Sequence, residues 1–161
     1  MLIVGGGCRG RQLASTLAGD GHAVRITTRT HAGCAAIEAC GAECWIGTPD
    51  RLATLRGALE NVTVALWLLG SATGPADVLR ALYSTRLALF LTQAIDTTVR
   101  GFVYEARGTS TPAEILADGE LTVRALTERN SIPTAFLTAD PRDLHGWLAD
   151  ARGAVASLLG G

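Results

Sequence analysis

The sequence predicts an α/β protein built on a doubly wound parallel sheet of about six strands. Short apolar segments alternate with helical segments along the whole chain, and this alternation favours parallel pairing with crossover helices. The chain has 161 residues, of which 48% are hydrophobic and 18% charged, so it is of single-domain size with enough apolar residues for a core. Six strand–helix units are what the strand order 3-2-1-4-5-6 requires. We therefore expect one domain over residues 1–161.

Six segments have the composition of strands. They are short, apolar or rich in β-branched residues, and bounded by turn-forming residues. They are residues 2–4, 23–28, 43–47, 62–69, 101–105 and 134–137. The fourth is apolar over nearly its whole length, which is typical of a strand buried on both faces.

Helices are predicted in the intervening segments. These are residues 11–17, 31–39, 50–59, 75–97, 112–129 and 141–159. The sequence Thr111-Pro112-Ala113-Glu114 predicts a capped start, with a hydroxyl at the cap, proline at the first position and a carboxylate at the third. Asp140 is the predicted cap of the last helix. In that helix, apolar residues at i, i+3 and i+4 spacing predict that Trp147 belongs to the core.

The charge composition excludes several classes of function. With 14 basic and 15 acidic residues the net charge is −1, so we expect no nucleic-acid partner and no anionic membrane surface. The longest apolar stretch, residues 62–69, is too short to span a bilayer. No signal-peptide pattern precedes the first strand, and a cytoplasmic location is expected. All 14 basic residues are arginine, which excludes mechanisms that need a lysine.

Four cysteines occur, at positions 8, 34, 40 and 44. They form no C-x-x-C pair and match no zinc-binding spacing, so no metal site is expected. We predict small, buried, reduced thiols. Cys8 differs because it lies within a glycine-rich segment, where it is expected to be partly exposed.

The segment Gly5-Gly6-Gly7-Cys8-Arg9-Gly10 predicts a phosphate-binding turn. It contains G-x-G-x-x-G, follows the first strand directly and opens a helix, which is the context in which this motif binds a dinucleotide. Gly5 would permit the turn, Gly7 would let a diphosphate approach the backbone, and Gly10 would allow close helix–strand packing. The helix N-terminus would add unpaired N–H groups and a partial positive charge. The alternative is a glycine turn kept only for packing, or a site that has lost its ligand.

The end of the second strand indicates which dinucleotide is preferred. It reads Thr28-Arg29-Thr30 and lacks the carboxylate that NAD sites use to hold the ribose hydroxyls. Arg29 could pair with a 2′-phosphate, Thr28 and Thr30 could add hydroxyl donors, and Arg9 could reach either the diphosphate or the 2′-phosphate. NADP is therefore favoured as cofactor, with NAD as the alternative. An ordinary solvent-exposed arginine is the other interpretation of Arg29.

Residues 21–29, 41–43, 52–59 and 62–69 resemble the atypical short-chain dehydrogenase/reductase group, and residues 99–104 resemble its fifth strand. The NmrA-like and NAD(P)-dependent epimerase-like proteins are the most similar branch. The resemblance implies a Rossmann domain that binds NAD(P). It implies cofactor contacts at Gly5, Gly7, Gly10 and Arg29, and around Gly70 and Ser71 after the fourth strand. The glycine turn is one residue shorter than that group's G-x-x-G-x-x-G.

The same resemblance leaves catalysis open. Enzymes of that group use Tyr-x-x-x-Lys, but here Leu87 follows Tyr83 and Gly108 follows Tyr104 at that spacing. Little of the chain remains after the sixth strand to form a substrate domain. We favour a cofactor-binding or redox-sensing module and assign no catalytic residue. The alternative is a small NAD(P)-dependent oxidoreductase completed in a homo-oligomer, for which residues 75–97 are a candidate contact.

Overall fold

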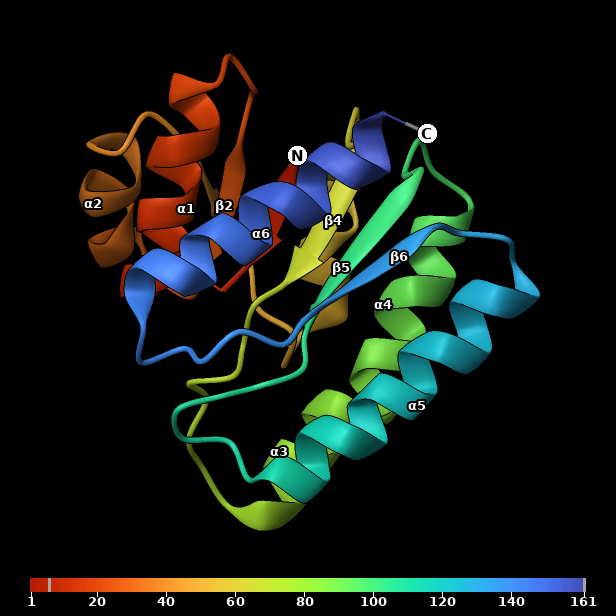
Figure 1. Ribbon diagram of the computed structural model, residues 1–161. Helices are drawn as coiled ribbons and strands as arrows, with labels where there is room; N and C mark the ends of the chain where they lie inside the picture. The colour runs from red at the N-terminus through yellow and green to blue at the C-terminus, as the bar shows by residue number, and fades with distance from the viewer. Residues whose placement is uncertain (6, 161) are drawn as a thin grey trace.

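Six parallel strands form one sheet with helices on both faces in the computed structural model, which describes residues 1–5 and 7–160 (Figure 1). The strands are β1 Leu2–Val4, β2 Arg25–Thr28, β3 Glu43–Ile46, β4 Val64–Trp67, β5 Gly101–Glu105 and β6 Thr134–Leu137. Their order across the sheet is β3-β2-β1-β4-β5-β6, and every neighbouring pair is parallel. The predicted fold class and strand order are confirmed.

Two helical layers cover the sheet. The longer helices are α1 Cys8–Gly19, α3 Ala76–Tyr83, α4 Thr85–Ile95, α5 Ala113–Arg129 and α6 Leu144–Leu159. Helices α1 and α6 lie on one face, and α3, α4 and α5 lie on the other (Figure 1). Trp147 of α6 is 1% exposed, so its prediction as a core residue is confirmed. Within the described part of the chain, no helix combines the length and apolar character needed to cross a membrane.

The central strands show why this sheet needs two layers. In β4, Val64 and Leu66 face the core beneath α1 and α6, whereas Ala65 and Trp67 face the core beneath α3 to α5. Successive side chains of a strand point to opposite faces, so an apolar strand must be covered on both sides. The ring of Trp67 packs 5.1 Å from that of Phe90 in α4, which fixes this helix over the sheet.

The prediction of a helix over residues 50–59 is wrong. The chain instead forms two 3-10 segments, η2 Leu52–Leu55 and η3 Gly57–Leu59. Side chains take carbonyls that a regular helix would use: the indole of Trp45 donates to Thr54 O at 2.8 Å, and the Thr54 hydroxyl donates to Arg51 O at 2.6 Å. Such local side-chain hydrogen bonds compete with helix formation.

The predicted helix over residues 75–97 is divided at Ser84, whose φ of −119° and ψ of −91° lie outside the helical region. The hydroxyls of Ser84 and Thr85 donate to the carbonyls of Arg80 and Ala81 at 2.7 and 3.4 Å. These bonds back onto the preceding turn accompany the change of direction between α3 and α4. The segment 31–39 is also shorter than predicted, with η1 His31–Gly33 followed by α2 Cys34–Glu38.

Both predicted cap residues have other roles. The Thr111 hydroxyl donates to Leu69 O and Ala72 O at 3.3 and 3.1 Å, so it joins the turn after β4 rather than capping α5. Asp140 accepts from the N–H of Arg142 in a turn, and α6 is capped by Asp143, which accepts from the N–H of Gly146 at 3.1 Å.

The expectation of four reduced thiols is also wrong for two of them. Cys34, the first residue of α2, and Cys44 of β3 form a disulfide with Cα atoms 5.3 Å apart. The pairing arises because α2 lies directly against β3, which the sequence spacing alone does not reveal. Cys40 is a half-buried free thiol, and Cys8 is free and exposed as expected.

We expect loss of this disulfide to destabilise the protein by about 2–3 kcal/mol, because a covalent link across a short loop restricts the unfolded chain. The measurement is urea unfolding of the wild type with and without a dithiol reductant, compared with Cys34→Ser/Cys44→Ser. Cys8→Ser is the matched control, since it removes an exposed free thiol. An unfolding midpoint of the wild type that does not respond to the reductant would contradict the prediction.

Candidate functional site

The predicted site residues gather at the carboxyl ends of β1, β2 and β4. The chain leaves β1 for β2 on one side and returns to β4 on the other, so β1 and β4 border the switch point at which open α/β sheets bind ligands. The glycine turn follows β1, residues 28–30 end and follow β2, and Gly70 and Ser71 follow β4. Gly6 lies outside the described residues.

Two glycines of the turn are required by packing. Gly5 has a φ of +125°, and a Cβ at this position would lie 2.1 Å from Leu68 O. A Cβ on Gly10 would lie 2.2 Å from Gly5 O. The turn therefore sits against the end of β4 and beneath the first turn of α1, with no room for a side chain at either position.

Gly7 differs from both. Its φ of −65° is open to any residue, and a Cβ there would meet only Ser71 Oγ, at 4.0 Å. Gly7 is the N-cap of α1, and no side chain among the described residues caps this end of the helix. Gly7 and Cys8 are both exposed. The turn thus presents bare backbone and the first N–H groups of α1 to the outside.

Two cavities flank the turn and share Gly5 as a wall. The larger, of about 410 Å³, is bordered by Thr28, Arg29 and Asp50 at its polar end and by apolar residues of α3 at the other. The smaller, of about 140 Å³, is bordered by Gly7, Arg9 and Ser71, with Glu105 and Trp147. Thr30 is exposed and borders neither cavity. Gly7 borders the smaller cavity only, so Gly5 is the residue of the turn that both cavities share.

The polar end of the larger cavity contains a carboxylate that sequence reasoning missed. Arg29, whose side chain is 77% exposed, lies 3.8 Å from the carboxylate of Asp50, and Arg86 of α4 pairs with the same carboxylate. Asp50 follows β3 rather than β2, in a segment that the sequence predicts as a helix, so no local pattern pairs it with Arg29. The signal available in the sequence was a carboxylate shortly after the third strand.

Arg9 is directed into the protein. Its Nη2 donates to Glu105 Oε1 at 2.8 Å, and its guanidinium lies 5.3 Å from the centre of the Trp147 ring. Its side chain is 19% exposed. Arg9 borders the smaller cavity, whereas Arg29 borders the larger one.

Glu105 ends β5 as a buried carboxylate that is 1% exposed. Besides Arg9, it accepts the N–H of Gly70 at 2.6 Å. Burial raises the pKa of Glu105, while the Gly70 N–H and the Arg9 guanidinium oppose this shift by favouring the charged form. The indole N–H of Trp147 lies near the carboxylate without hydrogen-bond geometry.

Both tyrosines belong to the core. The hydroxyl of Tyr104 donates to Leu116 O at 2.8 Å, and that of Tyr83 lies 3.5 Å from Thr111 Oγ1. Burial raises the pKa of both hydroxyls above the ordinary tyrosine value, so both are neutral. Neither tyrosine borders the two cavities at the glycine turn.

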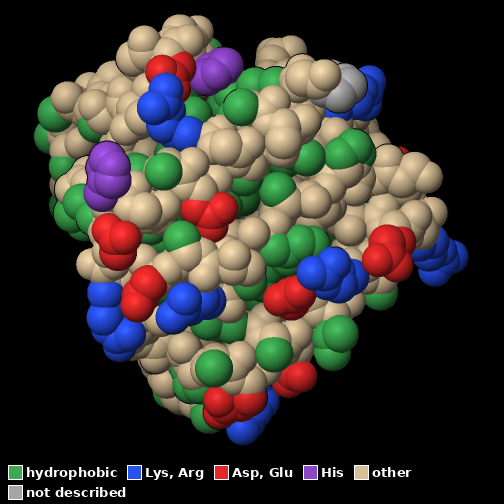
Figure 2. All heavy atoms as spheres, viewed as in Figure 1, with side chains coloured by type: hydrophobic (Ala, Val, Ile, Leu, Met, Phe, Trp, Pro, Cys, Tyr) green, Lys and Arg blue, Asp and Glu red, His purple; other side chains and the backbone are tan. Residues whose placement is uncertain are grey.

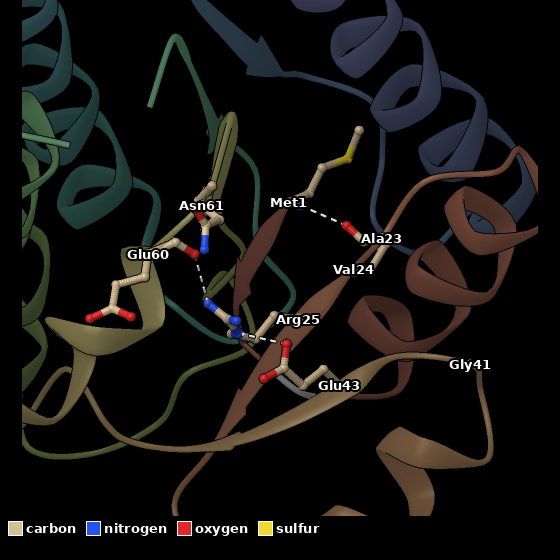
Figure 3. A pocket seen from close by; sticks show the side chains of 9 residues that line it. Met1, Ala23, Val24, Arg25, Gly41, Glu43, Glu60 and Asn61 are labelled. Atoms are coloured by element: carbon tan, nitrogen blue, oxygen red, sulfur yellow. Dashed lines mark hydrogen bonds and ion pairs between the residues drawn. The ribbon is translucent and has the colours of Figure 1, made fainter. Parts of the chain in front are cut away.

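A third cavity, of about 360 Å³, lies at the opposite edge of the sheet (Figure 3). Arg25 is one of the residues that line it, and it donates to Glu43 at 2.9 Å and to the carbonyls of Ala58 and Glu60 at 2.7 and 3.2 Å. The amino group of Met1 donates to Ala23 O. These polar groups pair with one another at the amino ends of the strands, so this cavity is not the candidate site.

The charges elsewhere give no second candidate. Arginine and acidic side chains are interspersed on the face seen in Figure 2. Over residues 1–5 and 7–160, no three histidine, cysteine, aspartate or glutamate side chains are grouped so that they could hold a metal ion. The glycine turn with its two cavities is therefore the site that we consider.

Comparison of the sequence with protein-family models and with curated proteins gives no match. Solved structures do match, and they define the class of fold. A short-chain dehydrogenase/reductase superfamily protein from Agrobacterium tumefaciens, solved with bound NAD, is 21% identical with a TM-score of 0.67, over 84% of this chain and 47% of that chain. Triphenylmethane reductase from Citrobacter sp., complexed with NADP(H), is 19% identical with a TM-score of 0.61, over 84% and 48%.

The UDP-glucuronic acid 4-epimerase of Bacillus cereus, in complex with NAD, is similar at 12% identity and a TM-score of 0.65, over 84% of this chain and 53% of that chain. These similarities establish that the chain has the Rossmann fold found in short-chain dehydrogenase/reductase structures. The chain spans about half the length of the solved structures it matches.

Proposed function

We propose that the chain binds a nicotinamide dinucleotide across the glycine turn, with the adenosine part in the larger cavity and the diphosphate over Gly7. The observation that carries this proposal is the open backbone at Gly7. A side chain there would meet only Ser71 Oγ, at 4.0 Å, in the smaller cavity that Gly7 borders at the uncapped end of α1. Backbone N–H groups at a helix N-terminus favour phosphate groups. The similar structures solved with NAD or NADP(H) support the same ligand class.

NADP is the favoured ligand, and NAD is the alternative. Arg29 and Arg86 contribute two positive charges at the ribose end, whereas Asp50 contributes one negative charge. The resulting positive balance suits a 2′-phosphate, and Arg29 is the more exposed of the two guanidiniums. The Thr28 hydroxyl lies beside this group, where it donates to Thr30 O at 3.3 Å.

We propose further that the chain acts as a cofactor-binding or redox-sensing module. A nicotinamide ring supplies hydride transfer when it is bound. Hydride transfer to a carbonyl also needs an acid near the reacting oxygen, and no lysine is present in the sequence to complete a Tyr-x-x-x-Lys pair. The burial of Tyr83 and Tyr104 supports the same conclusion.

A small oxidoreductase completed by a second copy of the chain is the alternative function. It is supported by exposed leucines on the outer helices, Leu89 of α4 at 55% and Leu121 of α5 at 66%. The test is calorimetric titration with NADPH and NADH, followed by incubation of the NADPH-loaded protein with a panel of carbonyl compounds. Binding without turnover supports the module, and turnover supports the oxidoreductase. No heat and no thermal shift with either dinucleotide would overturn both.

We expect two opposite changes of cofactor preference at the ribose end. Arg29→Asp should weaken NADPH binding by at least about tenfold relative to NADH, the scale of one lost charge-assisted hydrogen bond. Asp50→Asn should strengthen NADPH binding relative to NADH, because it removes a negative charge beside Arg29. Calorimetry with both ligands measures the ratio. Arg100→Asp, at the opposite edge of the sheet, is the matched control and should leave the ratio unchanged; equal ratios in all four proteins would remove Arg29 from the site.

A further inference from the structure

Glu105 joins two loops of the candidate site through one carboxylate. Its Oε2 accepts the N–H of Gly70, in the turn after β4, at 2.6 Å. Its Oε1 accepts the guanidinium of Arg9, in the first turn of α1, at 2.8 Å. Arg9 and Glu105 both border the 140 Å³ cavity, as does Ser71, the residue after Gly70. The Glu105 carboxylate is thus the common hydrogen-bond acceptor for the turn after β4 and for the first turn of α1.

The turn after β4 is fixed from its other side as well. The carbonyl of Gly70 accepts the N–H groups of Thr109, Ser110 and Thr111 at 2.9 to 3.2 Å. Gly70 and Gly108 approach so closely that a Cβ on Gly108 would lie 2.2 Å from Gly70 O. This turn is therefore held to the segment after β5, and Glu105 at the end of β5 links it to Arg9 in the first turn of α1.

The side chain of Arg9 is itself fixed by contacts on two sides. Its guanidinium has the Glu105 carboxylate on one side and the Trp147 ring at 5.3 Å. Arg9 is the second residue of α1, directly after Cys8, so the ion pair places the helix N-terminus. Across the cavity, Ser71 Oγ is the nearest group to the open side of Gly7.

We propose that Glu105 is the positioning residue of the diphosphate subsite, setting the separation between the N-terminus of α1 and the Gly70–Ser71 turn. The inference rests on the proposed function. Glu105 neutralises the charge of Arg9, so the diphosphate is bound by backbone N–H groups of the first turn of α1 and by Ser71. The guanidinium of Arg9 holds α1 in place and does not bind the ligand. Glu105 itself does not touch the ligand, because its carboxylate is occupied by its two donors and is 1% exposed.

The variant Glu105→Gln distinguishes a positioning role of Glu105 from the effect of its negative charge on ligand binding. The substitution removes a negative charge near a dianionic group, which by electrostatics alone would strengthen binding. If Glu105 positions the subsite, NADPH binding should instead weaken by about tenfold, the scale of a lost hydrogen bond to a charged group. Adenosine 2′-monophosphate, which has no diphosphate and occupies only the larger cavity, should bind with unchanged affinity. Calorimetry at one temperature with both ligands gives the comparison.

Two further variants complete the experiment. Glu105→Asp keeps the negative charge but has a side chain one methylene shorter. It should also weaken NADPH binding and leave the affinity for adenosine 2′-monophosphate unchanged. This variant replaces Glu105→Gln if Glu105→Gln does not fold. Arg9→Lys preserves a cation for the pair and should retain most of the NADPH affinity. NADPH binding that is unchanged or stronger in Glu105→Gln and Glu105→Asp overturns the inference, as does an equal loss for both ligands. Absence of NADPH binding to the wild-type chain overturns the proposed function itself.

Discussion

Alanine in place of Gly5 is expected to lower the free energy of unfolding by about 4 kcal/mol, the combined cost of a forbidden backbone conformation and of overpacking. The backbone at Gly5 has a φ of +125°, and the new Cβ would lie 2.1 Å from Leu68 O. Neither atom belongs to a flexible side chain, so relief requires movement of β4 away from the glycine turn. Urea unfolding followed by far-UV circular dichroism measures the change.

Gly153→Ala is the matched control for this experiment. Gly153 lies within α6, and a Cβ there would meet no atom within 4 Å. We expect this variant to be more stable than the wild type by up to about 1 kcal/mol, since alanine is a better helix former than glycine. If Gly5→Ala were to unfold at the same urea concentration as Gly153→Ala, the close approach of the turn to β4 would be disproved.

Alanine at Gly7 is expected to have the second largest effect, and on ligand binding rather than on stability. Its backbone conformation suits alanine and its Cβ would meet only Ser71 Oγ, at 4.0 Å, so the stability should stay within about 0.5 kcal/mol of the wild type. The added methyl group would occupy the space proposed for the diphosphate. NADPH binding should therefore weaken by at least about tenfold, as expected when contacts to a charged group are lost.

Calorimetry with NADPH tests the Gly7 variant, and urea unfolding of the same sample shows whether the fold is intact. Gly153→Ala again serves as the control, because its methyl group lies on α6 away from the glycine turn and should leave NADPH affinity unchanged. Full NADPH affinity in a stable Gly7→Ala protein would exclude a diphosphate above this residue. It would leave the glycine turn as a packing feature only.

The sheet could be predicted from the sequence because its signals are local. Strands β1, β4 and β5 are short, almost wholly apolar and bounded by turns, so their composition identifies them and their alternation with helices sets the order. The errors lie where distant side chains decide the backbone. Trp45 and Thr54 occupy carbonyls that residues 50–59 would need for a helix, and the hydroxyls at Ser84 and Thr85 accompany the break between α3 and α4.

The candidate site was predictable only in part, for the same reason. The glycine turn is a contiguous motif, and the packing of Gly5 and Gly10 agrees with the roles expected of them. The pair between Arg9 and Glu105 joins residues 96 positions apart, and the pair between Arg29 and Asp50 depends on the turn after β3. No local pattern reports such contacts. Whether the residues at this edge bind a dinucleotide remains a prediction.

The disulfide between Cys34 and Cys44 has a consequence for the cooperativity of the molecule. Of the described side chains in η1 and α2, Ile37 alone is buried, so apolar contacts contribute little to holding this corner against β3. The disulfide therefore holds α2 against β3, where apolar packing is weak. We therefore expect this corner to open before the rest of the fold when the disulfide is reduced.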